Sequence, residues 1–339
     1  MDPVPRLVRD ALAAAGDSPG YPATAGPSGL RVAAAAWLAR RHGVTVAPDA
    51  VLPVIGTKEL VAWLPTLLGC GPGDAVVHPV LAYPTYDVGA RLAGARPVAA
   101  DLAAADLAAA DGLPPPGSDR VALAWLNSPS NPTGQVLPAG QLAAAVHWAR
   151  EHGAIVASDE CYLELGFQAR PVSVLHPQAC GGSHRGLLAV HSLSKRSNMA
   201  GYRAGFVTGD PDLVAQLLEV RKHAGMMVPA PVQAAMTAAL GDDAHADAQH
   251  ARYAGRRAAL RPALEAAGWA VEHSQAGLYL WAAHPAYGCW ESVRVLAGTG
   301  ILVAPGEFYG PSGARHIRVA LTATDERIAA AVDRLAELA

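Results

Sequence analysis

A lysine among small polar residues follows an apolar run near the middle of the chain. The run Leu187 to His191 leads into Ser192, Ser194 and Lys195, and Arg203 lies eight residues after the lysine. A lysine just past an apolar strand is partly desolvated and acts as a nucleophile toward an aldehyde. Two serine hydroxyls and an arginine fork can converge on a phosphate. The same pattern also suits a polar turn, and this segment alone does not decide between the two.

A carboxylate stands at the end of a second apolar run. Ala154 to Ala157 leads into Asp159, and Tyr162 follows three residues later. A carboxylate at that place can pair with a protonated pyridine nitrogen and keep the ring an electron sink. A tyrosine hydroxyl nearby can bond to a phenolic oxygen on the same ring. Asp159 would equally suit the N-cap of a following helix, and Glu160 is expected to be a supporting or surface residue.

Two loops add candidate ligand contacts. Asn131 lies in the Pro/Gly-rich turn Asn127 to Gly134, directly after a predicted strand. Turn chemistry explains that composition, and the position also suits an asparagine pointing at a ligand. Gly56 to Lys58 separates a predicted strand from a predicted helix, where backbone N–H groups favour an anion. Thr57 and Lys58 are therefore candidate phosphate contacts, although glycines are frequent at such junctions.

The elements that must position these groups alternate between strands and helices up to about residue 229. Strands are predicted at 51–55, 75–78, 96–99, 121–126, 154–157, 187–191 and 204–208, with helices at 30–42, 58–68, 84–93 and 138–152. This alternation predicts an α/β fold with a mainly parallel sheet covered on both faces. Such sheets bind ligands beyond the carboxyl ends of their strands, where the polar motifs fall. The Ala/Asp-rich segment 102–119 is predicted to be a connecting loop, with an active-site lid as the alternative.

A smaller α+β domain is predicted after Pro229. Its elements are helices at 230–240, 245–267 and 290–297, strands at 270–273, 278–282, 302–303 and 316–320, and a last helix from 325. The N-terminal helix at about 4–15 is expected to join it. The predicted organisation is a large domain of residues 17–229 and a small domain of residues 1–16 and 230–339.

Composition excludes several classes of protein. The 339 residues carry a net charge of −3 with dispersed basic residues, so no nucleic-acid surface is expected. The apolar stretches are too short for a membrane span, and the first residues lack the pattern of a signal peptide, so none is expected. Four separated cysteines and 13 histidines without a ligand motif predict reduced thiols and no metal site. A cytoplasmic protein is expected.

In this order and spacing, the motifs resemble the fold-type-I enzymes that use pyridoxal 5′-phosphate (PLP), specifically the class I and II aminotransferases, over essentially the whole chain. The resemblance implies a mainly parallel seven-stranded sheet between helices, plus the smaller α+β domain. It implies that Lys195 carries PLP as a Schiff base and then moves protons, that Asp159 pairs with the pyridine nitrogen, and that Asn131 and Tyr162 hold the phenolic oxygen. The implied phosphate contacts are Ser192, Ser194, Arg203, Thr57 and Lys58.

Three more roles come from the resemblance. Tyr83 resembles the aromatic residue that stacks on the cofactor ring, although a core aromatic would otherwise be the expectation. Arg318 resembles the arginine that clamps the substrate α-carboxylate, a task its fork suits better than lysine does. Without the resemblance, an arginine on a predicted strand of the small domain would be expected to be a surface charge. Tyr21 resembles the tyrosine that reaches the phosphate of a neighbouring subunit, which implies a homodimer with shared active sites.

Longer stretches at 78–86, 192–198 and 221–229 resemble the bacterial succinyldiaminopimelate aminotransferases. That resemblance implies glutamate as amino donor and a role in lysine biosynthesis through diaminopimelate. Because both substrates carry extra carboxylates, a second cation is expected in the pocket, with Lys58, Arg196 and Lys222 as candidates. The alternatives are an aspartate- or alanine-type aminotransferase, a carbon–sulfur β-lyase and, in another class, a non-catalytic PLP-binding regulatory domain.

Relatives carry a glycine-containing stretch, upstream of the point where this sequence begins, that covers the substrate carboxylate. A chain without that stretch is expected to bind PLP and dimerise but to transaminate less well than a longer one, because an uncovered site stays wet.

Overall fold

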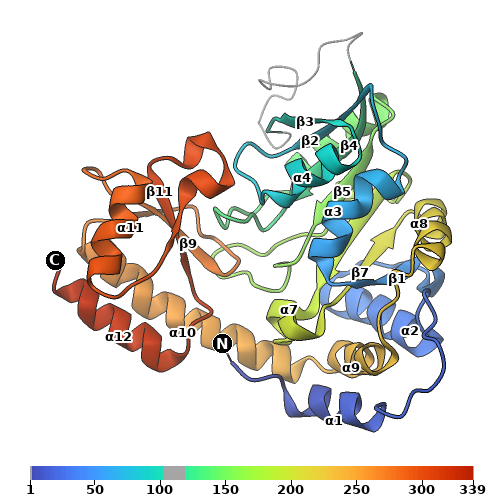
Figure 1. Ribbon diagram of the computed structural model, residues 1–339, viewed down its shortest axis with the longest axis horizontal. Coiled ribbons are helices and arrows are strands. Elements are labelled where there is room, and N and C mark those ends of the chain that lie inside the picture. The colour runs from blue at the N-terminus through green and yellow to red at the C-terminus, as the bar shows by residue number, and fades with distance from the viewer. Residues whose placement is uncertain (1, 102–118, 339) are drawn as a thin grey trace.

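Seven strands form one large sheet, in the order β1-β7-β6-β5-β4-β2-β3 (Figure 1). They are β1 (Val51–Ile55), β2 (Asp74–His78), β3 (Arg96–Ala99), β4 (Arg120–Asn127), β5 (Ile155–Asp159), β6 (Leu187–Ser192) and β7 (Ala204–Gly209). Strands β3, β2, β4, β5 and β6 run parallel, and β7 is antiparallel to both of its neighbours. This confirms the predicted mainly parallel seven-stranded sheet. The computed structural model describes residues 2–101 and 119–338, so the predicted loop at 102–119 lies outside the described residues except for Asp119.

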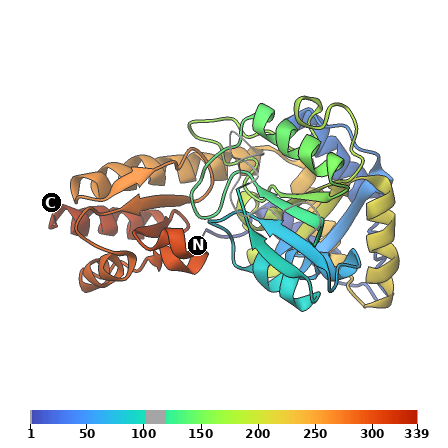
Figure 2. The same ribbon diagram turned by 90° about the horizontal axis from the view of Figure 1, so that it is seen from above.

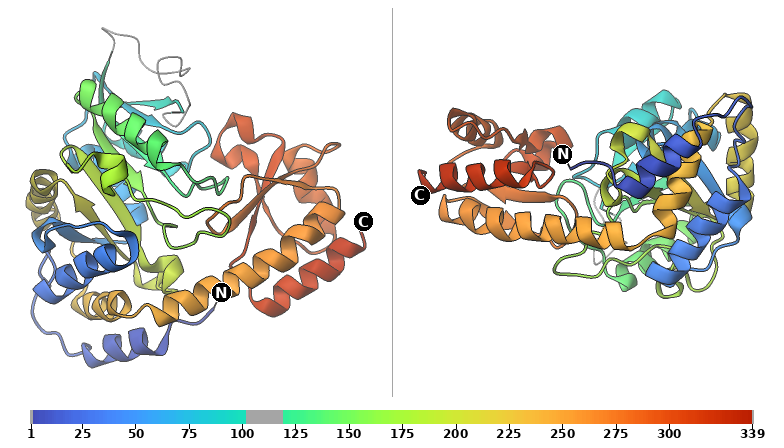
Figure 3. Two further views of the ribbon diagram at one scale, coloured as in Figure 1. Left: turned by 180° about the vertical axis from the view of Figure 1, so that it is seen from behind. Right: turned by 90° about the horizontal axis from the view of Figure 1, so that it is seen from below.

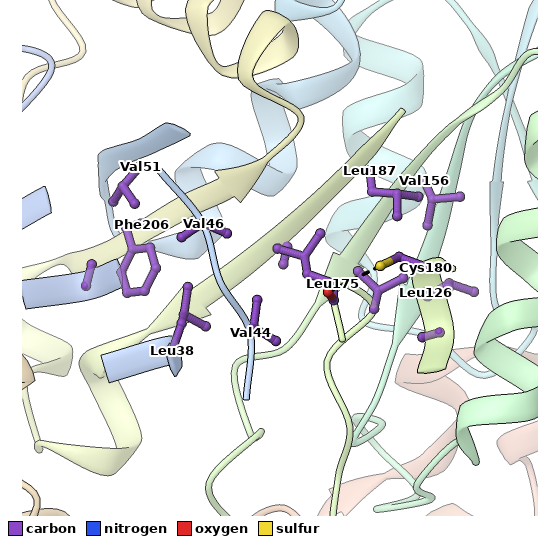
Figure 4. Packing of buried hydrophobic residues seen from close by; sticks show 14 of the residues in the cluster. Leu38, Val44, Val46, Val51, Leu126, Val156, Leu175, Cys180, Leu187 and Phe206 are labelled. Carbon is purple, nitrogen blue, oxygen red and sulfur yellow. Dashed lines mark hydrogen bonds between the residues drawn. The ribbon is translucent and has the colours of Figure 1, made fainter. Parts of the chain in front are cut away.

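Helices cover both faces of the sheet because successive strand residues point to opposite sides. On one face the strand side chains pack against α2 (Ser28–Trp37) and α5 (Ala139–Glu151). Figure 4 shows part of this core, where Leu126, Val156 and Phe206 of the strands lie among buried side chains from the covering segments. On the other face, strand residues such as Trp125 pack against helices α3 (Thr57–Leu67), α4 (Thr85–Leu92) and α8 (Pro211–His223).

The sequence-based prediction omitted α8, although the signals for its start are present. Pro211 occupies the first turn, and the Asp210 carboxylate accepts from the N–H of Asp212 at 3.0 Å, as an N-cap residue does.

Four antiparallel strands form the small sheet, in the order β10-β11-β9-β8. They are β8 (Ala270–Glu272), β9 (Tyr279–Ala283), β10 (Ala304–Pro305) and β11 (His316–Ala320), with helices α10 (Ala244–Ala266), α11 (Cys289–Gly298) and α12 (Asp325–Ala336). The strand predicted at 302–303 lies instead at 304–305, where its backbone pairs with Ile317 and Arg318. No helix in residues 2–101 and 119–338 is long and apolar enough to cross a membrane.

Helices α1 (Arg6–Ala14) and α9 (Ala230–Gly241) pack with the large sheet, which corrects the predicted small domain of 1–16 and 230–339. Val8 and Met236 are fully buried in the same core as the large-sheet strands. The chain instead crosses over along α10, which runs from beneath the large sheet to the small one (Figures 1 and 3). Seen from above, the small sheet and its helices stand to one side of the large sheet (Figure 2).

Candidate active site

A cavity of about 470 Å³ opens beyond the carboxyl ends of β4, β5 and β6, facing β9 and β11 of the small sheet. The carboxyl ends of parallel strands meet at one edge of a sheet, so loops far apart in sequence converge there. The structure brings together every residue predicted to hold the cofactor or the α-carboxylate except Tyr21, which is 97% exposed and does not line the cavity. The lining residues are Thr57, Lys58, Val61, Tyr83, Asn131, Asp159, Cys161, Tyr162, Ser192, Ser194, Lys195, Ala200, Arg203, Tyr279 and Arg318.

Asp159 presents a buried carboxylate to this cavity from the end of β5. The hydroxyl of Tyr86 donates to its Oδ2 at 2.8 Å and the N–H of Cys161 to its Oδ1 at 3.2 Å. Burial raises the pKa of the Asp159 carboxyl although these two donors oppose the rise, so a cationic partner would favour its ionised form. The residues that follow form turns, so Asp159 does not cap a helix. Tyr86 was not singled out from the sequence, because only the fold brings α4 beneath β5.

A cradle for an anion lies at the first turn of α3. Gly56 has a φ of +71°, and a Cβ there would clash with Nη2 of Arg203, so the guanidinium sits directly against this turn. The backbone carbonyl of Ala200 fixes the guanidinium by accepting from Nη1 at 2.9 Å. The hydroxyl of Ser192 accepts from the N–H of Ser194 at 3.1 Å. Helix-terminal N–H groups, hydroxyls and a guanidinium together suit a phosphate.

Lys195 lies in the single-turn helix α7 (Leu193–Arg196) with its side chain half-buried. Among the described residues, no carboxylate forms an ion pair with its Nζ. The next residue differs, because the buried guanidinium of Arg196 pairs with Glu164. The Lys195 amine therefore remains available for a covalent bond.

Hydrogen bonds join the small sheet to the large one across the cavity. Nη1 of Arg318 donates to Oδ1 of Asn131 at 2.9 Å. The N–H of Asn131 donates in turn to Oδ1 of Asn127 at 2.7 Å, and Nδ2 of Asn127 donates to the carbonyl of Asp159 at 3.0 Å. Asn127 thus holds the Asn131 turn against the end of β5. The sequence placed Asn127 in the motif without giving it a role.

The guanidinium of Arg318 also lies against two tyrosine rings, at 3.9 Å from the ring centre of Tyr279 and 4.9 Å from that of Tyr309. Its Nε is buried and has no hydrogen-bond partner in residues 2–101 and 119–338, so the group has donor capacity left for a ligand. Neither tyrosine was predicted. A strand was expected at 278–282, but nothing in its pattern shows that Tyr279 faces the site.

Of the three predicted second cations, Lys58 alone lines the cavity. Arg196 is buried, pairs with Glu164 and donates to the carbonyl of Ala239 at 2.9 Å. Lys222 is on the surface of α8 and pairs with Glu219 one turn earlier. The structure therefore gives Arg196 and Lys222 structural or surface positions, because their helices turn them away from the strand ends.

These observations test whether the residues fit a phosphate-bearing aldehyde with a pyridine ring. One cavity is lined by the lysine amine, by the buried Asp159 carboxylate and by the anion cradle against Gly56. Because burial raises the pKa of Asp159, a cationic partner would favour its ionised form. They fit that group. The fold and the site define a PLP-dependent enzyme of fold type I.

Residues 2–335 match the model of the family aminotransferase class I and II, and the chain belongs to this PLP-dependent family. It is 64% identical to a probable aminotransferase of Mycobacterium tuberculosis, over 99% of this chain and 78% of that protein. It is 60% identical to the 4-dedimethylamino-4-oxo-anhydrotetracycline transaminase OxyQ of Streptomyces rimosus, over 99% and 90%. A solved structure titled as a probable N-succinyldiaminopimelate aminotransferase from Thermus thermophilus superposes with a TM-score of 0.86 at 30% identity, covering 100% of this chain and 92% of that one. The predicted fold class, the PLP cofactor and the aminotransferase activity are confirmed.

Proposed function

We propose that this aminotransferase moves an amino group between glutamate and N-succinyl-2-amino-6-oxopimelate, the reaction of a succinyldiaminopimelate transaminase. The observation that carries the proposal is the charge of the cavity. Four cationic side chains line it, Lys58, Lys195, Arg203 and Arg318, against the single carboxylate of Asp159. This surplus matches a phosphate together with substrates that bear more than one carboxylate.

The cofactor would be held by the residues that converge on the cavity. Asp159 would pair with the pyridine nitrogen, Tyr83 would stack on the ring, and Asn131 and Tyr162 would donate to the phenolic oxygen. Arg318 engages the side-chain oxygen of Asn131, and the side-chain nitrogen has no bond to another described residue, so it is free to donate to the cofactor. The phosphate is bound by Thr57, Lys58, Ser192, Ser194 and Arg203. When bound, PLP supplies an electron-withdrawing ring that stabilises negative charge at the substrate Cα.

The protein's own groups hold the substrate and move the proton. The guanidinium of Arg318 binds the α-carboxylate with its free donors while Asn131 and the two tyrosine rings fix its plane. The Nζ of Lys195, which no carboxylate of the described residues neutralises, takes the proton from Cα and returns it on the other side of the transferred nitrogen. The buried Tyr86 holds the Asp159 carboxylate in place throughout.

Lys58 is the candidate for the distal carboxylate of the substrate. Its Nζ lies 5.9 Å from the centre of the Tyr83 ring, on the cavity wall formed by the first turn of α3. Lys58 therefore lines the same cavity as the anion cradle and the α-carboxylate-binding Arg318 proposed above. The flexible aliphatic chain of Lys58, unlike a rigid guanidinium, can then adjust to the difference in length between glutamate and the succinylated acceptor.

The test is a panel of amino donors and 2-oxo-acid acceptors with the PLP-loaded enzyme. We expect the highest kcat/KM for N-succinyl-diaminopimelate with 2-oxoglutarate. Faster turnover of aspartate or alanine, or release of sulfide from cysteine conjugates, would replace this proposal with an aspartate- or alanine-type transaminase or a β-lyase. A complete lack of turnover with every donor would favour a PLP-binding regulatory role.

A second candidate is amination of a ketone on a polycyclic substrate, which the 60% identity to OxyQ favours. The panel should therefore include 4-dedimethylamino-4-oxo-anhydrotetracycline with glutamate as donor. Preference for this ketone would assign the enzyme to that reaction. Such a substrate lacks the distal carboxylate chain. Because Lys58 is also a proposed phosphate contact, Lys58→Met is assayed at saturating PLP, where it should leave the KM of this ketone unchanged and raise the KM of a succinylated dicarboxylate.

We also propose a homodimer with shared active sites. Tyr21 stands 97% exposed in the extended segment between α1 and α2, where it makes no contribution to the cavity of its own chain. A second copy would bury this ring and bring its hydroxyl to a phosphate. Light scattering gives the mass in solution, and Tyr21→Phe should weaken PLP retention. A monomeric species with full PLP affinity would refute the proposal.

A further inference from the structure

Two tyrosine hydroxyls meet at the wall of the cavity. The Oη atoms of Tyr162 and Tyr279 lie 3.1 Å apart, and the two rings are edge-to-face with centres 5.8 Å apart. The backbone fixes this meeting, because the N–H of Gly277 donates to the carbonyl of Leu165 at 2.8 Å. That bond ties the start of β9 to the loop after β5. The contact therefore joins the small sheet to the large one through side chain and backbone alike.

The other side of the Tyr279 ring supports Arg318. The guanidinium carbon of Arg318 lies 3.9 Å from the ring centre, closer than to the ring of Tyr309. A cation over an aromatic face within about 6 Å is attracted by the ring quadrupole. One side chain thus touches both the arginine on β11 and the tyrosine that follows β5.

We propose that Tyr279 is a positioning residue that couples the two ends of the site, seating Arg318 with its ring and donating its hydroxyl to Tyr162. This inference rests on the proposed function, from which Arg318 and Tyr162 take their roles. The direction of the hydroxyl bond follows from the number of protons available. Tyr162 has one hydroxyl proton, which it gives to the phenolic oxygen of the cofactor, so Tyr279 must be the donor between the two.

The hydroxyl of Tyr279 should favour the anionic form of the cofactor's phenolic oxygen. Burial raises the pKa of the Tyr162 hydroxyl well above its usual value, so it keeps its proton and acts as a donor. A hydroxyl that accepts a hydrogen bond is a stronger donor through its own proton. Tyr279 therefore strengthens the bond to the phenolic oxygen and favours its anionic form. The titratable and charged groups that face this pair are Asp159, Cys161, Lys195, Tyr253, Tyr309 and Arg318.

The experiment compares Tyr279→Phe with Tyr279→Leu in the PLP-loaded enzyme, by two readouts other than turnover. The first is the pH midpoint at which the absorbance of bound cofactor changes. The second is the dissociation constant of glutarate, a dicarboxylate without an amino group. Tyr279→Phe loses the hydroxyl and keeps the ring, so the midpoint should rise by about 0.3 to 1 pH unit with glutarate binding unchanged. Tyr279→Leu should raise the midpoint similarly and weaken glutarate about three- to thirtyfold.

Tyr287→Phe is the matched control, since it removes a hydroxyl from the small domain outside the cavity and should change neither readout. An unmoved midpoint in Tyr279→Phe overturns the hydroxyl link, and unchanged glutarate binding in Tyr279→Leu overturns the seating of Arg318. Arg318→Lys separates the inference from the function on which it rests. If Arg318→Lys weakens glutarate binding and Tyr279→Leu does not, the seating of Arg318 by Tyr279 is wrong while the proposed role of Arg318 stands. If none of the three variants affects glutarate, the proposed role of Arg318 fails as well.

Discussion

Replacing Arg318 by lysine keeps the charge in the cavity and removes the fork. In the structure, Nη1 is already committed to Oδ1 of Asn131 at 2.9 Å, and the guanidinium plane lies against Tyr279 at 3.9 Å. The remaining donors are left to bind a carboxylate. An ammonium cannot keep the Asn131 bond, the ring contact and two parallel carboxylate bonds at once. At least one charge-assisted hydrogen bond is lost, which costs about 1.5 to 3 kcal/mol. That corresponds to a rise in KM of about 10- to 150-fold.

The assay follows each half-reaction separately in single turnovers, varying glutamate in one and 2-oxoglutarate in the other. Both substrates present an α-carboxylate to the same site, so both KM values should rise together. Arg315→Lys is the matched control, because Arg315 is exposed and, among the residues that the structure describes, donates only to the carbonyls of His284 and Pro285. A rise for one substrate only would reassign Arg318 to side-chain recognition. Unchanged values for both would refute the reasoning.

Four further variants test the cofactor site and the core. Lys195→Ala should abolish turnover while the protein still retains PLP through its phosphate contacts, as absorbance after dialysis will show; normal transamination in this variant would sink the assignment. Arg203→Ala should raise the dissociation constant of PLP about 30- to 150-fold, from the loss of a charge-assisted pair worth about 2 to 3 kcal/mol. Gly56→Ala should also raise the dissociation constant of PLP, because its Cβ would displace the Arg203 guanidinium. If both variants bound PLP as tightly as the wild type, the phosphate site would have to lie elsewhere. Burial raises the pKa of the Glu160 carboxyl from 4.5 to about 7. Between these pH values the folded state binds more protons than the unfolded state. The contribution of Glu160 to the free energy of unfolding therefore falls as pH rises through this range. The Tm of Glu160→Gln minus the Tm of the wild type should therefore be larger at pH 8 than at pH 5. The same Tm difference at both pH values would contradict this.

Local signals were sufficient for most elements of the large sheet. The apolar runs that became β1, β5 and β6 are short, bounded by polar or glycine residues, and buried on both faces, so composition alone marks them. The boundary between the sheets was not predicted correctly. Helix α9 is apolar around its circumference, and the sequence does not show whether that surface packs against α2 or against the small sheet.

The sequence by itself determined the chemistry that the site can carry. The carboxylate Asp159 ends one strand, the nucleophile Lys195 follows another, and the arginine Arg203 directly precedes a third. Their types and order define the family. Only the tertiary structure decided the contacts among them: which hydroxyl holds Asp159, which carbonyl fixes the Arg203 guanidinium, and which ring lies beneath Arg318. The partner of Asp159, Tyr86, is 73 residues away in sequence, and Asn131 is 187 residues from Arg318. Spacing along a chain reports which strand a residue follows, but contacts between separate elements depend on the packing of whole helices and sheets, which no local pattern encodes.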